Sequence, residues 1–237
     1  MGAAQQTRFV ADRPDDLRRP TRWHRYGHHT RRLPERLEAL ARELLVPPQG
    51  SVLDYGCADV PYRRFFADDV DFVAADIAGN PDATLVLDAD GSVPLPDESV
   101  DAVMSTQVLE HVPDPAAYLA ECVRVLRPGG RLLLSTHGVF VWHPDPIDWW
   151  RWTSDGLRHV IEEAGFEVVR FEGVVGLLAT GIQLVQDAVY WHVPRVLRPV
   201  LALVLQTAMA LADRLEGDDG RNRNAQTYAL VAAKPAA

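Results

Sequence analysis

The stretch Ser51-Val52-Leu53-Asp54-Tyr55-Gly56 decides the fold, because it has the pattern of a short buried strand that ends at a tight turn. Similar apolar runs recur along the chain, and Pro and Gly clusters separate them from segments with helical periodicity. These runs lie at 71–76, 83–87, 100–106, 131–136, 166–171 and 226–232. The alternation of strands and helices predicts an α/β domain with a seven-stranded, mostly parallel sheet and helices on both of its faces.

Four helices are expected, one before the first strand and three between later strands. The first covers 34–46, and its apolar face carries Leu37, Leu40, Ala41, Leu44 and Leu45. The second covers 61–66, with Pro61 near its first position. The third starts at Asp114-Pro115 and ends at Gly129-Gly130, and the fourth covers 153–165.

The composition is that of one globular domain, with 237 residues of which 47% are hydrophobic and 24% are charged. The two cysteines, Cys57 and Cys122, and an N-terminal segment without an apolar signal favour a cytoplasmic protein. The net charge of -9 disfavours nucleic acid as a partner, although residues 1–36 hold nine Arg and four acidic residues.

We expect four parts in the chain, of which the second holds most of the sheet. They are an N-terminal helical lid at 1–49 that includes Tyr26 and His29, a Rossmann-like core at 50–172, an apolar helical insertion at 173–224, and the last strand with its tail at 225–237. Two stretches of the insertion, each of 14 residues, carry no charge and are shorter than the roughly 20 residues that cross a bilayer. We interpret residues 173–212 as two helices that cover the functional site, form a homodimer surface or make a peripheral membrane contact.

Polar or small residues follow the predicted strands, at the positions where doubly wound sheets bind ligands. Gly56 follows the first strand, and Asp76 lies 20 residues later, at the spacing where a carboxylate accepts hydrogen bonds from ribose hydroxyls. Other residues at such positions are Asp88, Asp90, Gln107, Glu110, His111, His137 and His143. Each alone fits a turn or a solvated strand end, but together they predict a ligand site at one edge of the sheet.

The turn after the first strand lacks the G-x-G-x-x-G pattern of dinucleotide-binding sites. It reads Gly56-Cys57-Ala58-Asp59-Val60-Pro61 and has a single glycine. This departure disfavours a site that cradles pyrophosphate. A cofactor that has adenine and ribose but no phosphate groups needs less glycine and more carboxylates, and the sequence fits that requirement.

Several motifs now carry a family resemblance. They are Val52-Leu53-Asp54-Tyr55-Gly56-Cys57, the acid at Asp76, Asp88-Ala89, the run from Val93 to Asp101, Val108-Leu109-Glu110-His111-Val112, and Arg124-Val125-Leu126-Arg127-Pro128-Gly129-Gly130. In this order and spacing, the block resembles a class I S-adenosylmethionine-dependent methyltransferase of the small bacterial type. The later His143-Pro144 and Trp150-Arg151-Trp152-Thr153 resemble a loop found in a subset of these enzymes, several of them associated with glycan or secondary-metabolite tailoring.

The resemblance implies the Rossmann-like methyltransferase fold, with a helical insertion before its last strand, and S-adenosylmethionine as the cofactor. It implies that the methionine half lies against Asp54 and Gly56, and that Asp76 holds both ribose hydroxyls. The full set of implied cofactor-binding residues is Asp54, Gly56, Cys57, Ala58, Asp76, Ile77, Asp88, Ala89 and Gln107. Ala58 departs from the family pattern, because a second glycine is common at this position.

Histidines and a carboxylate are candidates for moving the proton of a hydroxyl acceptor. We consider His111, His137 and His143 as general bases, favour His143, and take Asp148 as an orienting partner. His143 lies in the loop 140–152, which holds four of the six tryptophans, and aromatic faces suit a sugar or a planar acceptor. In the alternative, the tryptophans pack the loop onto the core and His143 only binds backbone. No metal site is predicted, because no compact ligand set is evident.

The sequence therefore predicts an enzyme that transfers a methyl group from S-adenosylmethionine to an oxygen of a small molecule, such as a sugar or a natural-product hydroxyl in secondary metabolism. Two other classes stay open at this point. One is a partner-binding module that keeps the fold without catalysis. The other is a nicotinamide-dependent dehydrogenase, which would share Asp76 but lacks its glycine pattern.

Overall fold

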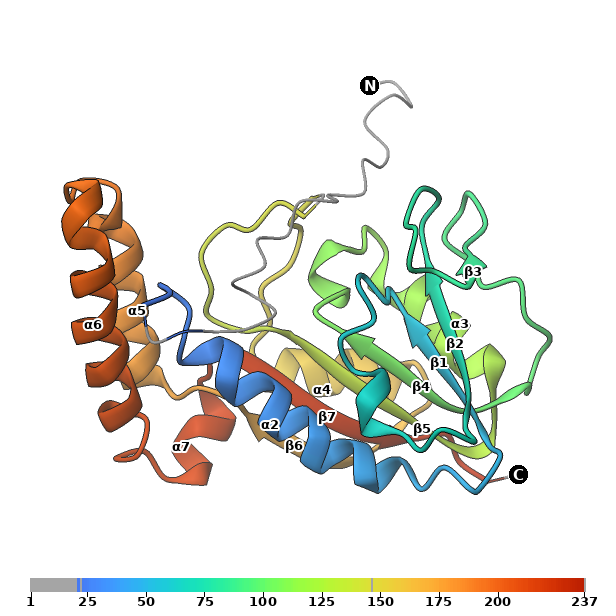
Figure 1. The fold of residues 1–237 in the computed structure, drawn as a ribbon. Helices are drawn as coiled ribbons and strands as arrows, with labels where there is room; N and C mark the ends of the chain where they lie inside the picture. The colour runs from blue at the N-terminus through green and yellow to red at the C-terminus, as the bar shows by residue number, and fades with distance from the viewer. Residues whose placement is uncertain (1–20, 22, 146, 237) are drawn as a thin grey trace.

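The computed structural model describes residues 21, 23–145 and 147–236. Its centre is a seven-stranded sheet with the order β3-β2-β1-β4-β5-β7-β6 (Figure 1). The strands are β1 (Ser51–Tyr55), β2 (Asp71–Asp76), β3 (Leu85–Val86), β4 (Val100–Thr106), β5 (Leu126–His137), β6 (Glu167–Gly173) and β7 (Thr227–Ala233). The pairs among β1 to β5 are parallel, and β7 is antiparallel to both of its neighbours. This arrangement confirms the predicted mostly parallel α/β sheet.

Helices cover both faces of the sheet and enclose two apolar cores. One core lies under α3 (Pro115–Val125) and α4 (Ser154–Glu163), and the other lies under α2 (His29–Ala41). Adjacent residues of a strand point to opposite faces, so that Leu53 enters the first core and Val52 the second. The two caps expected for α3 and α4 are present, because Asp114 accepts a hydrogen bond from Ala117 N and Thr153 accepts one from Gly156 N.

Helix α2 begins five residues before the predicted start, and Pro34 lies inside it rather than in its first turn. Proline in a helix interior removes a backbone hydrogen bond, which is why the sequence favoured a later start. The earlier turns form because Leu33 is buried and His29 Nε2 lies 2.9 Å from Thr227 Oγ1 of β7. The helix continues as the 3-10 turn η1 (Arg42–Leu44), and Leu45, predicted on the apolar face, is left-handed and 67% exposed.

The helix predicted at 61–66 is absent, and only the 3-10 turn η2 (Arg63–Phe65) forms there. Val60 has a φ of 53° before this segment and Phe66 is extended after it, so too few residues remain for a stable α-helix. Helix α3 ends at Val125 instead of Gly129-Gly130, because Leu126 already has extended backbone and pairs with β4. The strand predicted at 83–87 is reduced to Leu85–Val86.

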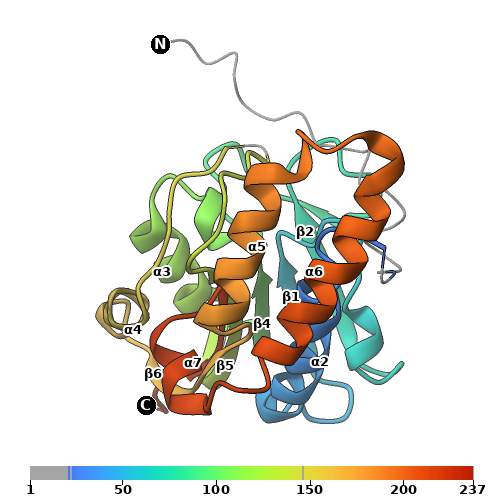
Figure 2. The same cartoon turned by 90° about the vertical axis from the view of Figure 1, so that its left-hand side faces the viewer.

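Between β6 and β7 the chain forms α5 (Leu177–Tyr190), the 3-10 turn η4 (Arg195–Leu197), α6 (Arg198–Ala212) and α7 (Asp218–Arg223). Helices α5 and α6 run side by side as a hairpin at one end of the sheet (Figure 1). In Figure 2 this hairpin lies in front of the sheet and of α2, and no described helix or strand covers its outer side. The helical insertion expected before the last strand is therefore present.

Candidate cofactor and acceptor site

The turn after β1 brings two strands into close contact. Gly56 has a φ of +86°, and a Cβ atom added to it would lie 2.5 Å from Val108 Cγ2 in the turn after β4. The backbone N–H groups of Gly56 and Cys57 both donate to Ala75 O of β2, at 2.8 and 3.0 Å. Only glycine meets the conformation and the space at this position. The turn therefore lies close to the ends of both β2 and β4.

Ala58 continues the turn with a φ of 48°, in the left-handed region where L-residues other than Asn and Asp are uncommon. Its N–H donates a hydrogen bond to Asp76 Oδ2 at 2.9 Å. This geometry explains why a glycine is common at this position in the family that the sequence resembles. Ala58 preserves the backbone contact but adopts a strained conformation to do so.

We expect Ala58→Gly to stabilise the protein by roughly 0.5–1 kcal/mol, because relief of left-handed strain exceeds the added freedom of the unfolded chain. Urea unfolding measures this change. Ala89→Gly is the matched control, since Ala89 is exposed and is not among the residues with positive φ. Equal or lower stability of Ala58→Gly would contradict the assignment of strain to this position.

Asp76 ends β2 and organises the turn. Its Oδ1 accepts from Ile77 N at 2.8 Å, and its Oδ2 accepts from Ala58 N and from Asn80 Nδ2, the latter at 2.7 Å. Asn80 is buried and also donates to Ala58 O at 2.7 Å. The sequence analysis did not identify Asn80, whose only signal is an amide four residues after Asp76. Asn80 positions Asp76 and the turn relative to each other.

Asp54 is a buried carboxyl at the end of β1. It is 1% exposed, and neither carboxylate oxygen has a hydrogen-bond partner among the described residues. Burial, together with the negative charge of Asp76, raises the pKa of Asp54 to about 8. Burying a carboxylate oxygen that receives no hydrogen bond lowers the stability of the folded protein. A cationic ligand beside Asp54 would restore part of that stability.

The remaining predicted cofactor residues lie around the same strand ends. Gln107 follows β4 with a φ of 57°, and its Nε2 donates to Ser135 Oγ of β5 at 3.1 Å. Asp88 and Ala89 lie in an exposed loop after β3. The Tyr55 hydroxyl donates to Gly91 O and so connects this loop to β1. The buried Cys57 places its Sγ 3.9 Å from Asp76 Oδ2.

The loop after β5 gathers histidine rings. The centroid of His143 lies 5.6 Å from that of His111 and 5.7 Å from that of His137, and His137 stacks on Phe140 at 4.0 Å. His111 Nδ1 lies 2.7 Å from Ile147 O, and burial lowers the pKa of His111. The three histidines considered as bases are therefore brought together around His143.

Asp148 contacts His143 through its backbone, because Asp148 Oδ2 accepts a hydrogen bond from His143 N at 2.8 Å. Arg151 also pairs with both carboxylate oxygens of Asp148. Burial opposes ionisation of Asp148, but the hydrogen bonds from Arg151 and His143 outweigh it and lower its pKa. Asp148 thus fixes the loop backbone beside the imidazole of His143.

Glu110 and His137, both expected at the ligand-binding strand ends, form a buried pair that the sequence did not indicate. Glu110 Oε1 lies 3.2 Å from His137 Nδ1, and Glu110 Oε2 accepts from Thr136 Oγ1 at 2.8 Å. Burial raises the pKa of Glu110 to about 7 and lowers that of His137. The carbonyl oxygen of Glu110 accepts from the N–H groups of Trp149 and Trp150, so this residue also ties down the aromatic loop.

The segment before α2 reaches the same loop. Tyr26 stacks on Phe140 with centroids 6.0 Å apart, and the ring of His29 lies 5.8 Å from it. Both residues were predicted in an N-terminal lid. Within the described part of the chain, no group of three or more His, Cys, Asp or Glu side chains has an arrangement that could hold a metal ion.

Comparisons with known proteins agree with this geometry. Residues 53–134 match the family model described as a methyltransferase domain. A probable S-adenosylmethionine-dependent methyltransferase of Mycolicibacterium smegmatis is 42% identical over 88 residues, which are 35% of this chain and 34% of that protein. A ubiquinone biosynthesis O-methyltransferase of Dinoroseobacter shibae is 37% identical over 95 residues, which are 33% of this chain and 38% of that protein. The chain thus spans about a third of the length of these relatives.

Solved structures show the same fold at low sequence identity. The Burkholderia thailandensis 1,6-didemethyltoxoflavin-N1-methyltransferase, solved with S-adenosylhomocysteine, has a TM-score of 0.52 at 17% identity and covers 85% of this chain and 78% of its own. A Haemonchus contortus N-methyltransferase, also solved with S-adenosylhomocysteine, has a TM-score of 0.56 at 15% identity and covers 93% of this chain and 59% of its own.

The sheet order, with a tight turn after β1 and an acidic residue at the end of β2, is the arrangement of Rossmann-like α/β folds that bind nucleoside-containing ligands at this edge. The matched block, residues 53–134, is similar to class I S-adenosylmethionine-dependent methyltransferases and includes the ends of β1, β2 and β4 around this site. The residues fit that cofactor, because Asp54 offers two buried acceptors without donors and the turn at Gly56 has no room for a side chain.

Proposed function

We propose that the protein transfers a methyl group from S-adenosylmethionine to a hydroxyl oxygen of a small molecule, such as a sugar or a natural product of secondary metabolism. The observation that carries the proposal is the position of the histidine-rich aromatic loop, which follows β5 next to the cofactor strands. Gln107 and Ser135 link β4 to β5 at this point. A hydroxyl acceptor gains from a neighbouring imidazole that removes its proton as the bond to the methyl carbon forms.

The cofactor supplies an activated methyl group, and the chain supplies its binding site. In this proposal Asp76 accepts hydrogen bonds from the two ribose hydroxyls, and the turn around Gly56 lies against the methionine half. Asp54 faces the cationic part of that half. The exposed loop with Asp88 and Ala89 reads the adenine edge, while Cys57, Ala58, Ile77 and Gln107 line the remaining surface.

Proton transfer from the acceptor is assigned to His143, with His111 beside it. Burial keeps His111 neutral at neutral pH, because it lowers the pKa of this imidazole. Asp148, paired with Arg151, holds the backbone of His143 and so limits the movement of the base. A fixed base close to the acceptor oxygen lowers the entropy lost in reaching the transition state.

The aromatic loop offers surfaces for the acceptor. Trp142 is 77% exposed, and Trp149 and Trp150 also expose part of their rings. Exposed indole faces bind sugar rings and planar aromatic molecules. The name of the Dinoroseobacter shibae relative, whose similarity covers 33% of this chain, also supports an oxygen acceptor.

Production of S-adenosylhomocysteine in the presence of a panel of glycosides and phenols tests this function. With an accepted substrate, we expect His143→Ala to lower kcat by about a hundredfold, within the range for loss of a general base, and to leave S-adenosylmethionine affinity unchanged. His159→Ala is the matched control, because His159 is exposed on α4. Unchanged turnover of His143→Ala would remove this residue from the proposed role.

Residues 173–212 are the proposed contact surface for a larger partner, either a second copy of the chain or a membrane. Their outer side carries many exposed apolar residues, which single-domain soluble proteins rarely gather in one place. The choice between these two partners depends on the arrangement of α5 and α6.

A further inference from the structure

The hairpin of α5 and α6 has its polar side inside and its apolar side outside. Its buried positions include Gln183, Gln186 and Gln206, each at most 3% exposed. Its exposed positions include Val185 and Val204, each 59% exposed. Helices of soluble proteins show the opposite distribution, because water favours polar residues on the outer face.

The inner glutamines bond to one another, and Gln186 and Gln206 also bond to the segment before α2. Gln206 Nε2 donates to Arg25 O at 2.6 Å and to the side-chain oxygens of Gln183 and Gln186 at 3.0 and 3.1 Å. Gln206 Oε1 accepts from His28 N at 2.7 Å. This network fixes which side of the hairpin faces the protein, so the apolar side must face outward.

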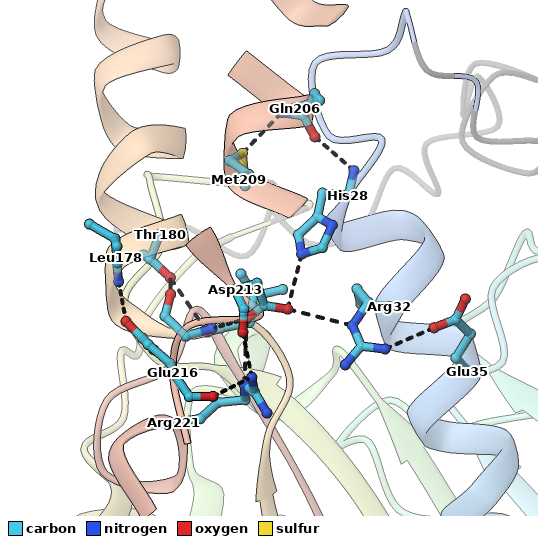
Figure 3. A network of polar contacts seen from close by, with 12 residues as sticks. His28, Arg32, Glu35, Leu178, Thr180, Gln206, Met209, Asp213, Glu216 and Arg221 are labelled. Carbon is cyan, nitrogen blue, oxygen red and sulfur yellow. Dashed lines mark hydrogen bonds and ion pairs between the residues drawn. The ribbon is translucent and has the colours of Figure 1, made fainter. Parts of the chain in front are cut away.

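The base of the hairpin is anchored by Asp213 (Figure 3). Asp213 Oδ2 lies 3.1 Å from His28 Nε2, and Asp213 Oδ1 accepts from Gly176 N at 2.9 Å. The guanidinium of Arg221 donates to Asp213 O at 2.6 Å. Helix α5 begins on the carboxylate of Glu216, which accepts from the Leu177 and Leu178 N–H groups. The hairpin is therefore held in one orientation with its apolar side exposed.

The tip of the hairpin combines aromatic and cationic side chains. Trp191 is 62% exposed, and the guanidiniums of Arg198 and Arg25 lie 4.8 and 5.3 Å from its ring centroid. Arg195 is also exposed, and no Asp or Glu occurs from residue 188 to residue 212. Trp and Arg together are typical of the zone between lipid headgroups and acyl chains.

One acidic residue, Asp187, lies near the tip and is paired with Arg25 at 3.7 Å, which leaves Arg195 and Arg198 as the tip's excess charge. The other acidic residues of this region lie at the opposite end of the hairpin. Asp213 and Glu216 are engaged in the base contacts, and Asp218 and Asp219 begin α7. The tip therefore carries a local positive charge that complements anionic headgroups. In a two-fold dimer with antiparallel hairpins, the positive tip of one chain would face the acidic base of the partner's hairpin. In a dimer with parallel hairpins, the two positive tips would repel each other.

The anchoring of the hairpin favours an orientation in the membrane surface. Residues Arg195–Ala212 have a mean hydropathy of 1.4, only 22% of this segment is buried, and by length and composition it could cross a membrane. Gln206 holds the inner side of this segment against Arg25 and His28, so only its outer side is free to meet lipid. An open apolar groove of about 670 Å³ also lies between the helices, lined by Leu177, Leu178, Gly181, Ile182, Val185, Leu205 and Glu216.

We propose that the outer face of the α5–α6 hairpin binds the interface of a membrane that contains anionic lipids, with both helices parallel to the surface and the tip arginines at headgroup level. Amphipathic helices bind membranes in this way, with their apolar side at the boundary of the acyl chains. The proposal does not depend on the methyl acceptor. If it holds, the acceptor site works beside a lipid surface.

Flotation of the full chain with vesicles tests the proposal. We expect binding to vesicles of phosphatidylcholine with 30% phosphatidylglycerol that is at least about tenfold stronger than binding to phosphatidylcholine alone, and weaker in high salt. Val185→Glu/Val204→Glu should lower binding at least about tenfold. Arg195→Gln should reduce only the preference for anionic vesicles.

The matched control is Val86→Glu/Val169→Glu, which adds two charges at exposed valines, 52% and 49% exposed, on other elements. This control should bind like the wild type, and circular dichroism should show that both double variants are folded. A wild type that stays with the soluble fraction in both vesicle mixtures would overturn the proposal. A stable dimer that Val185→Glu/Val204→Glu dissociates, without vesicle binding, would assign the face to a second copy of the chain.

Discussion

Replacing Asp76 by alanine is expected to weaken S-adenosylmethionine binding by at least about a hundredfold, because each hydrogen bond from a ribose hydroxyl to a carboxylate contributes roughly 1.5–3 kcal/mol. The substitution also removes the acceptor for Ala58 N and Asn80 Nδ2, so the turn after β1 loses its support. Calorimetric titration measures the affinity directly.

The matched control for this variant lies on the same strand. Asp71 begins β2 and is exposed at the end of the strand away from the site, so Asp71→Ala should bind the cofactor like the wild type. Asn80→Ala should weaken binding less than Asp76→Ala, since Asn80 acts only by positioning the carboxylate. Unchanged affinity of Asp76→Ala would show that the ribose is bound elsewhere.

Replacing Asp54 by asparagine is expected to change how stability depends on pH. Burial raises the pKa of Asp54 to about 8 in the folded protein, above the 3.8 of an ordinary aspartate. Between these two values the unfolded chain loses a proton that the folded chain retains, so the wild type loses up to about 1.4 kcal/mol of stability for each pH unit of increase. Asparagine carries no charge and removes this slope.

Urea unfolding of the cofactor-free protein at pH 5 and pH 8 tests this expectation. Relative to the wild type, Asp54→Asn should gain roughly 3–4 kcal/mol more at pH 8 than at pH 5. Replacing the carboxyl group by an amide also changes the free energy of unfolding by an amount that does not depend on pH. This amount drops out when the two pH values are compared. Equal pH slopes for the two proteins would mean that Asp54 is already ionised in the folded state.

The same variant should lose affinity for S-adenosylmethionine while it gains stability at alkaline pH. The buried Asp54 carboxylate has no hydrogen-bond donor among the described residues and lowers the stability of the cofactor-free protein, and a cationic ligand would offset this loss. Functional sites commonly reduce stability in this way. Titrations in buffers with different ionisation enthalpies should therefore detect proton release when the wild type binds the cofactor near pH 7.

Local patterns predicted the sheet and most of the cofactor strands. The run at Ser51–Tyr55 and the acid at Asp76 could be placed because strands leave a short apolar signal and the carboxyl ends of parallel strands share one edge. The caps at Asp114 and Thr153 were also predictable, since capping depends on neighbouring residues only.

Features that depend on distant contacts could not be predicted. The early start of α2 depends on His29 and its contact with Thr227, 198 residues later in the chain. The Glu110–His137 pair joins the 3-10 turn Leu109–His111 after β4 to the end of β5, and only the fold brings these two residues together. The helix predicted at 61–66 fails because Val60 has a left-handed backbone, which no propensity indicates for a β-branched residue.

Calorimetric titration of the purified wild-type chain with S-adenosylmethionine and S-adenosylhomocysteine tests the central claim most directly. We predict one binding site per chain and a Kd below about 100 μM for both molecules, equivalent to roughly 5.5 kcal/mol of binding free energy or more. Absence of binding at millimolar concentrations of either molecule would contradict the assignment of the strand ends around Asp54 and Asp76 as a cofactor site.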